Sequence, residues 1–298
     1  MTAPRPTRDA DLTEPGVPPE AYTEEYFLSN CNGFQYYLAS HGRDPAPRLR
    51  RALALARVQR GERVLDIGCG RGELLVQCAL LGAHATGIDY AEAAVRLAAA
   101  AVAELEPALR DRVAVRQMDA RRLEFADGAF DVVFMTDVVE HLYPEELDQA
   151  MAEVRRVLAP QGRLIVHTAP NGLFYGPVWR HYVRHVHRVV KLMAAAARVR
   201  SAGFRDLMFP TGQEPPRSPY ELQMHVNEHS PGDLRRLLRR HGFRIRRMDY
   251  HDPDRGSYRA SLPVRLLDTV RFLRPLSYYP PLDRLFSNHI WAVATPDA

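Results

Sequence analysis

Short apolar segments alternate with segments of helical periodicity along the middle of the chain. Runs of four to seven mostly apolar residues predict five strands, at 62–67, 84–88, 112–117, 130–135 and 162–168. Amphipathic spacing predicts the helices between them, at 72–81, 91–105 and 144–158. Short strands that alternate with helices form a parallel sheet with right-handed crossovers. The pattern therefore predicts an α/β fold with a doubly wound, mostly parallel sheet.

The regular alternation stops at Pro170-Asn171-Gly172 and resumes near residue 229. Ser230-Pro231-Gly232-Asp233 is a helix start signal, and it predicts a helix over 232–241 that Gly242 ends. Strands are expected at 243–250 and 289–295. We also expect Pro160-Gln161-Gly162 to be a turn that closes the helix over 144–158.

These breaks divide the 298-residue chain into four parts. Residues 1–20 are rich in Pro, Asp, Glu and Thr and are expected to form a disordered tail. Residues 21–60 carry many aromatic residues and a helix over 47–56, and are interpreted as a helical cap. Residues 61–172 and 229–298 form the α/β domain, and residues 173–228 form an insert.

The segment that contains the insert and the helix and strand expected after it is the basic part of the chain. Residues 171–250 contain 15 Lys and Arg against 6 Asp and Glu, although the net charge of the whole chain is only +4. Within it, an amphipathic helix is expected, with Trp179, Val183, Val186, Val190, Met193 and Ala197 on one side. The other side carries Arg180, Arg184, Arg188, Lys191 and Arg198. Such a helix favours an anionic membrane surface, a phosphorylated substrate or a solvated surface; nucleic acid is a weaker alternative.

The run VLDIGCGRGE at 64–73 carries the clearest chemical signal. A strand, a tight glycine turn and a helix start bind nucleotide-like ligands in doubly wound folds. The dinucleotide fingerprint G-x-G-x-x-G would need glycine at position 73, where this chain has Glu73. Asp66, two residues before Gly68, favours a ligand that carries a cation over one that carries a pyrophosphate. The expected loop residues are Asp66, Gly68, Cys69, Gly70 and Gly72.

Two further acids follow the next two strands. Asp89, with Tyr90, ends the second strand and can accept hydrogen bonds from a ribose; Asp119, with Ala120, follows the third and can accept from an adenine amino group. A single Asp at a strand end is often only a helix N-cap. Three Asp residues in register along the carboxyl edge of one sheet, Asp66, Asp89 and Asp119, indicate a ligand site.

The cysteines and the lengths of the apolar segments indicate the cellular compartment that we expect. The three cysteines, Cys31, Cys69 and Cys78, form no C-x-x-C pair, which is typical of a reducing cytoplasm. No apolar segment reaches the roughly 18 residues of a membrane span, and the N-terminus has no apolar signal-peptide core. We expect a cytoplasmic protein.

From about Glu20 to Thr295 the chain resembles the class I S-adenosylmethionine (SAM)-dependent methyltransferases. The similar motifs are VLDIGCGRG, GIDY, MDA, FDVVFMTDVVEHL and VLAPQGRLIVHTAPN. The resemblance implies a seven-stranded sheet whose last strand is antiparallel. It also implies that the loop holds the methionine part of SAM, Asp89 the ribose, and Asp119 with Ala120 the adenine. The ubiquinone-pathway O-methyltransferase type is most similar, and its arginine for the SAM carboxylate falls on Arg48.

Catalytic candidates lie at the end of the fourth strand, in Thr136 to His141. His141, Glu140 and, from the insert, His225 are candidates for positioning the acceptor or for taking its proton. Thr136 is assigned to the SAM site. Asp137, Glu140 and His141 resemble the E-x-x-E-H metal pattern of the ubiquinone type and of RNA 2′-O-methyltransferases, but Asp137 is one methylene shorter. A divalent metal is therefore a minor alternative to a general base or a structural role.

The main functional hypothesis is methyl transfer from SAM to an oxygen or nitrogen of a small molecule, sugar or lipid precursor. An RNA 2′-O-methyltransferase is the alternative that the basic insert and the D-x-x-E-H string allow, although no interleaved aromatic and arginine pattern supports RNA stacking. A non-catalytic SAM-binding protein is the alternative of another class. The sequence does not indicate the acceptor or the oligomeric state.

Overall fold

Seven strands form a single sheet in the computed structural model, which describes residues 16–186, 188–189, 219–250 and 280–297. The strand order is β3-β2-β1-β4-β5-β7-β6. The strands are β1 (Arg63–Ile67), β2 (His84–Asp89), β3 (Val113–Gln117), β4 (Phe130–Thr136), β5 (Leu158–Thr168), β6 (Phe243–Asp249) and β7 (Ile290–Pro296). β1 to β5 pair in parallel, and β7 runs antiparallel to both of its neighbours. The predicted doubly wound fold and its antiparallel last strand are confirmed.

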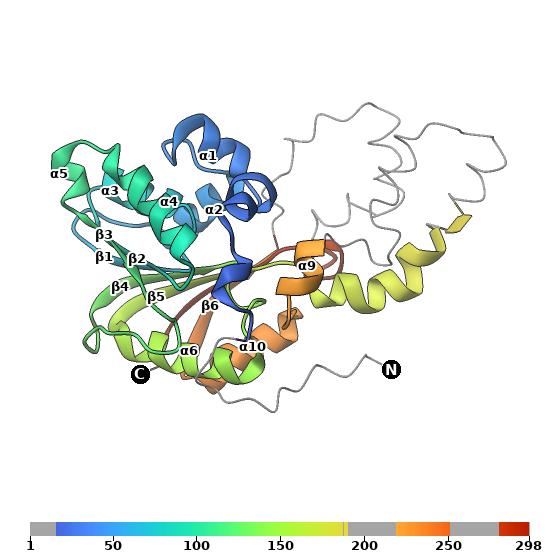
Figure 1. Cartoon of the computed structure of the whole chain (residues 1–298). Coiled ribbons are helices and arrows are strands. Elements are labelled where there is room, and N and C mark those ends of the chain that lie inside the picture. Colours follow the sequence, from blue (N-terminus) through green and yellow to red (C-terminus); the bar gives the residue numbers. More distant parts are fainter. Residues whose placement is uncertain (1–15, 187, 190–218, 251–279, 298) are drawn as a thin grey trace.

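Helices cover both faces of this sheet (Figure 1). One face carries α1 (Phe34–Ser40), α2 (Pro47–Ala56), α3 (Glu73–Leu80), α4 (Glu92–Ala103) and α5 (Pro107–Arg110), and the other carries α6 (Pro144–Val157) and α10 (Pro231–Arg240). The short elements are η1 (Pro19–Ala21), η2 (Tyr26–Asn30), η3 (Phe174–Val183), α9 (Pro219–Met224) and α12 (Asp283–Phe286). No helix of the described part is long and apolar enough to cross a membrane.

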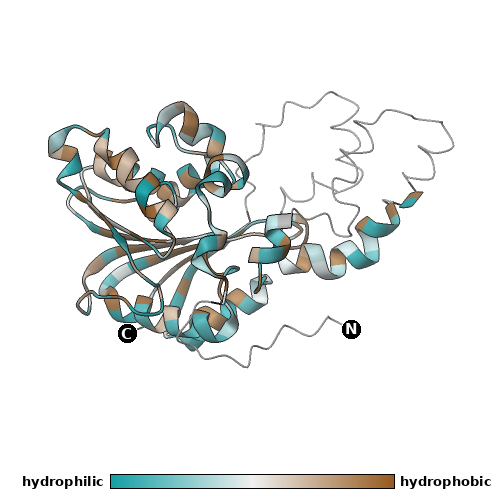
Figure 2. Cartoon of the chain, viewed as in Figure 1, coloured by the Kyte–Doolittle hydropathy of each residue, from teal (hydrophilic) through white to brown (hydrophobic). Residues whose placement is uncertain are grey.

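The central strands are buried on both faces, which explains their nearly continuous apolar runs. Leu65 and Ile67 of β1 pack in the cluster beneath α6 and α10, whereas Val64 packs in the cluster beneath α2, α3 and α4. Side chains of a strand alternate between faces, so Asp66 lies on the α3 side with Val64. Figure 2 shows brown positions along the strands of the sheet and teal positions on the outer faces of the helices.

β5 differs from the expected boundaries. The chain passes from α6 directly into a strand at Leu158, so the segment 160–162 lies within β5 and does not separate the helix from it. Leu158 pairs with Phe130, and the next pair is Val132 with Arg163, so the residues between Leu158 and Arg163 bulge out of the ladder. Gly162 fits there because a Cβ atom would lie 2.7 Å from Leu158 Cδ1.

The N-terminal segment packs from Gly16 onward. The Gly16 amide donates to Glu146 Oε1 at 2.6 Å, Val17 is buried, and the Tyr90 hydroxyl donates to the Val17 carbonyl. Residues 16–20 of the expected tail are therefore held against the domain, and residues 1–15 lie outside the described part.

The insert is described in part. Trp179 and Val183 are buried and Arg180 is exposed, as the amphipathic pattern predicts, although η3 has π-helical hydrogen bonding with Pro177 inside it. Val190, Lys191, Met193, Ala197 and Arg198 lie outside the described residues.

Candidate active site

One cavity of about 680 Å³ opens at the carboxyl ends of β1, β2 and β4. The N-terminal cap, the glycine loop, the strand ends and the returning insert all contribute to its wall. The predicted site residues that line it are Arg48, Asp66, Gly68, Cys69, Gly70, Asp89, Tyr90, Asp119, Ala120, Thr136, Asp137, Glu140, His141 and His225. Gly72 is not among the lining residues. The structure thus brings residues from both halves of the chain to one site.

The glycines of the loop serve two different purposes. Gly68 has φ of 69°, and a Cβ atom there would lie 2.7 Å from Val138 Cγ2. Gly72 has φ of 81°, and its Cβ would lie 2.9 Å from the Ala98 backbone. Both positions use the left-handed region that favours glycine. Gly68 therefore permits the loop to pass the end of β4, whereas Gly72 permits α3 to approach α4.

Asp66 and Asp89 are buried acids that face the same cavity. Asp89 accepts hydrogen bonds from the amides of Gly70 (3.1 Å) and Ala91 (3.0 Å), yet burial raises its pKa from 3.8 to about 6. Burial, together with the charges of Asp89 and Glu73, raises the pKa of Asp66 well above its usual range. Asp66 Oδ1 has no hydrogen-bond partner among the described residues. An unpaired buried carboxyl oxygen at a cavity wall fits a ligand that brings a donor or a cation.

Asp119 is held by its own segment. Its carboxylate accepts from the Arg121 amide (2.8 Å) and pairs with the Arg121 guanidinium (2.7 Å), which also lies 3.4 Å from Glu146. The carboxylate remains one-third exposed and lines the cavity. The carboxylate can therefore contact a ligand in the cavity without giving up its bonds to Arg121.

Asp137 is tied into a buried chain of polar groups. It has φ of 56°, and its carboxylate lies 2.9 Å from Arg48 Nε and 2.6 Å from His167 Nδ1. His167 Nε2 in turn lies 3.0 Å from His289 Nδ1. The charges of Arg48 and His167 hold the pKa of Asp137 well below its usual range despite burial. Asp137 therefore compensates Arg48 and does not join Glu140 and His141.

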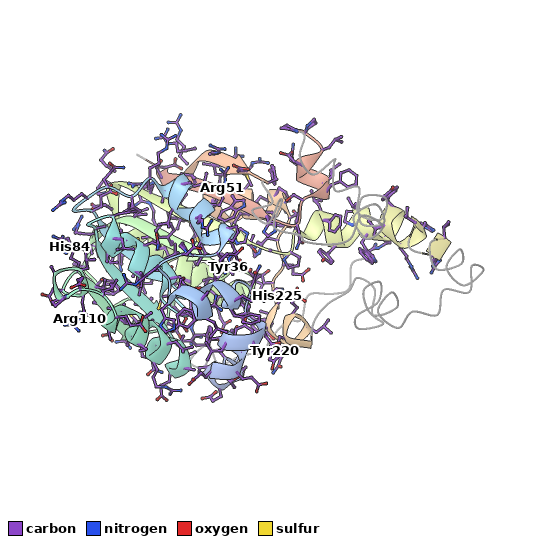
Figure 3. The ribbon with its side chains drawn as sticks, turned by 90° about the horizontal axis from the view of Figure 1, so that it is seen from above. Tyr36, Arg51, His84, Arg110, Tyr220 and His225 are labelled. Carbon is purple, nitrogen blue, oxygen red and sulfur yellow. The ribbon has the colours of Figure 1, made fainter. Side chains whose placement is uncertain are left out.

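Glu140, His141 and His225 form a separate cluster at the other end of the 136–141 turn. One ligand atom from each lies within 4.8 Å of the others, which is close enough to hold a metal ion. Glu140 accepts from the Thr168 hydroxyl (3.0 Å), and burial and the charge of Asp137 raise its pKa well above the usual range. Burial and His225 lower the pKa of His141 to about 3, so its imidazole is neutral at pH 7. Figure 3 places His225 near Tyr220, on the side of the returning insert.

Tyr22 is a site residue that sequence reasoning did not single out. Its hydroxyl lies 2.9 Å from His141 Nδ1, and its ring packs edge-on against Tyr26 and Tyr90. The aromatic residues of the cap were the only available signal, because 119 positions separate Tyr22 from His141. His167 and His289 were also missed, since nothing in their local sequence indicates their contact.

Residues 65–166, about a third of the chain, match the model of the family described as "Methyltransferase domain". This part of the chain is a class I methyltransferase domain. The resemblance seen in its motifs is confirmed at the level of the domain. The family match begins within β1, ends within β5 and includes the helices between them.

Two curated relatives are similar to this chain in sequence, and a solved structure is similar to it in fold. A demethylmenaquinone methyltransferase of Thermus thermophilus is 35% identical over 46% of this chain and 61% of its own length. A ubiquinone biosynthesis O-methyltransferase of Pseudomonas aeruginosa is 35% identical over 41% of this chain and 52% of its length. A putative S-adenosylmethionine dependent methyltransferase of Listeria monocytogenes, 16% identical, matches the fold with a TM-score of 0.54 over 87% of this chain and all of that one. The chain spans half to three-fifths of the length of these two curated relatives.

Proposed function

We propose that this protein transfers a methyl group from SAM to an oxygen or nitrogen atom of a small-molecule acceptor. The observation that carries the proposal is the pair of buried acids, Asp66 and Asp89, beside the glycine loop, with one oxygen of Asp66 unpaired. A SAM molecule offers two hydroxyls and an ammonium, and these groups suit the two carboxyls better than a phosphate would.

Different residues of the cavity would bind different parts of SAM. Asp89 would accept from the ribose hydroxyls, Asp66 would face the ammonium, and Ala120 with Asp119 would flank the adenine. Arg48 would meet the SAM carboxylate while it keeps its pairing with Asp137. SAM supplies a methyl group that is already activated by its sulfonium, so the protein mainly has to hold the acceptor in line with it.

The acceptor would lie at the end of the cavity that holds Glu140, His141 and His225. The neutral imidazole of His141 can accept a hydrogen bond from an acceptor hydroxyl or amine, and because its pKa is lowered to about 3 it would position the acceptor more effectively than it would take its proton. The Thermus relative is named for demethylmenaquinone and the Pseudomonas relative for ubiquinone biosynthesis, which supports a small organic acceptor over a macromolecule. The same three residues would hold a divalent cation if one is used, and the oxygen and nitrogen ligands would suit a borderline metal.

Calorimetric titration tests the donor half of the proposal. The purified protein should bind SAM and its demethylated product, S-adenosylhomocysteine, and should not bind NADH. Transfer of a labelled methyl group from SAM into a metabolite extract then tests the acceptor half. Binding of NADH without binding of SAM would refute the proposal.

A further inference from the structure

Arg71 lies inside the glycine loop, but its side chain hydrogen-bonds to Glu73 and to the N-terminal cap. It is only 2% exposed, and its guanidinium makes five hydrogen bonds. Two go to Glu73 Oε1 (3.1 and 2.9 Å), and three go to the carbonyls of Phe27 (2.7 Å), Cys31 (3.2 Å) and Asn32 (3.0 Å). A guanidinium has five N–H groups, so all of its donors are used within the protein.

One carbonyl, that of Phe27, lies within the five-residue η2, and those of Cys31 and Asn32 follow its last residue. Carbonyls at a helix C-terminus lack partners within the helix, and a cation placed there satisfies them and interacts favourably with the helix dipole. Arg71 therefore closes this helix from a position about 40 residues away in sequence. The Tyr37 ring, 5.7 Å from its guanidinium carbon, packs against it from α1.

Glu73 supplies the negative charge that offsets the cost of burying the Arg71 guanidinium. It is 4% exposed, is the first residue of α3 and pairs with Arg71. A buried guanidinium without a counter-charge is strongly unfavourable. The residue that replaces the third glycine of the dinucleotide fingerprint is thus the partner of Arg71.

We infer that Arg71 is a positioning residue that fixes the N-terminal cap to the donor loop. The cap supplies Tyr22, Tyr26 and Phe27 to the cavity wall, and Tyr22 contacts His141. The loop that would bind the donor therefore also sets the wall beside the acceptor. This coupling rests on the proposed function, whereas the attachment of the cap by Arg71 does not.

Amide hydrogen exchange of residues 22–34 tests the inference in the full chain without ligand. The reporters are the amides of Phe27, bonded to Thr23, and of Cys31, bonded to Tyr26. Arg71→Lys keeps the charge but loses at least two donors and the planar fork, so these amides should exchange at least about tenfold faster. Arg63→Lys is the matched control, because Arg63 also bonds a carboxylate and a carbonyl but at the opposite end of β1. Equal exchange in R71K and the wild type would overturn the inference.

S-adenosylhomocysteine tests the coupling. It should slow exchange of the cap in the wild type, and R71K should bind it about tenfold more weakly and lose that protection. A wild type that does not bind S-adenosylhomocysteine would refute the proposed function, while the exchange of the free protein would still decide the role of Arg71. If R71K does not fold, Glu73→Gln tests the same attachment by removing the counter-charge, and unchanged cap exchange in E73Q would then overturn the inference.

Discussion

Asp89 allows a prediction that separates ligand binding from stability. Its carboxylate is buried, its pKa is raised to about 6, and the proposed ribose contacts require the ionised form. A carboxyl that must lose a proton to accept hydroxyl hydrogen bonds links ligand affinity to pH. We expect S-adenosylhomocysteine to bind with constant affinity above about pH 7 and up to tenfold more weakly for each pH unit below 6.

The free-energy cost of ionising Asp89 in the folded protein follows from the shift of its pKa. A rise from 3.8 to about 6 corresponds to about 3 kcal/mol of unfavourable ionisation in the folded state. The folded pKa lies above the unfolded value, so the stability linked to the protonated group is present below about pH 4. It is lost as the pH rises through 6. Asp89→Asn removes this cost at pH 8 but leaves one of the two amides, Gly70 or Ala91, without its acceptor, which costs about 1–3 kcal/mol.

The two effects of Asp89→Asn should therefore differ at pH 8. Its thermal stability should stay close to that of the wild type, while its affinity for S-adenosylhomocysteine should fall by about 10- to 100-fold and lose the dependence on pH. Calorimetry and thermal melts from pH 5 to 8 measure both quantities, with the exposed Asp127→Asn as control. Unchanged affinity in D89N, or wild-type affinity that does not vary between pH 5 and 7, would refute the assignment of Asp89.

Three further outcomes are expected. Gly72→Ala should lower the free energy of unfolding by about 1–3 kcal/mol more than Gly61→Ala in urea titrations. Both glycines have positive φ, but only at Gly72 would a Cβ meet backbone, so equal losses would contradict this account. Methyl transfer should survive exhaustive chelation, because Glu140 and His141 already have protein partners; loss of activity that one divalent cation restores would instead assign a metal to Glu140, His141 and His225. The basic insert should give salt-sensitive sedimentation with vesicles of anionic lipid, and no sedimentation at low salt would exclude a membrane role.

The sheet was predictable because its information is local. β1, β2 and β4 are short, mostly apolar runs that end at or just before Gly or Asp, and parallel strands place Asp66 and Asp89 at one edge. The start of β5 was not predictable. Its pairing from Leu158 depends on Phe130 of β4 and on a bulge that the local sequence does not encode. The turn signal of Pro160 and Gly162 describes the bulge, which lies inside the strand.

The cluster of Glu140, His141 and His225 was less predictable because it depends on contacts between distant residues. Asp137 occurs in sequence with Glu140 and His141, yet its left-handed backbone and the positions of Arg48 and His167 remove it from that cluster. His225 takes its place through the return of the insert, and the Val226 amide bonds the Glu140 carbonyl. The local sequence motif could not show that His225 replaces Asp137 beside Glu140 and His141.

The distribution of charge separates the partners expected for the basic insert. Of the described residues that line the cavity, the three arginines, Arg48, Arg71 and Arg121, are all ion-paired with acids of the same cavity. A phosphorylated acceptor would find no uncompensated arginine among them, whereas a neutral acceptor or one that carries an amine needs none. The exposed Arg180 lies instead on η3, the yellow-green helix that extends away from the sheet (Figure 1), and Arg188 beyond η3 is exposed as well. An anionic surface recognised by that helix would therefore bind the outside of the molecule, and the methyl acceptor itself would enter the cavity without a phosphate.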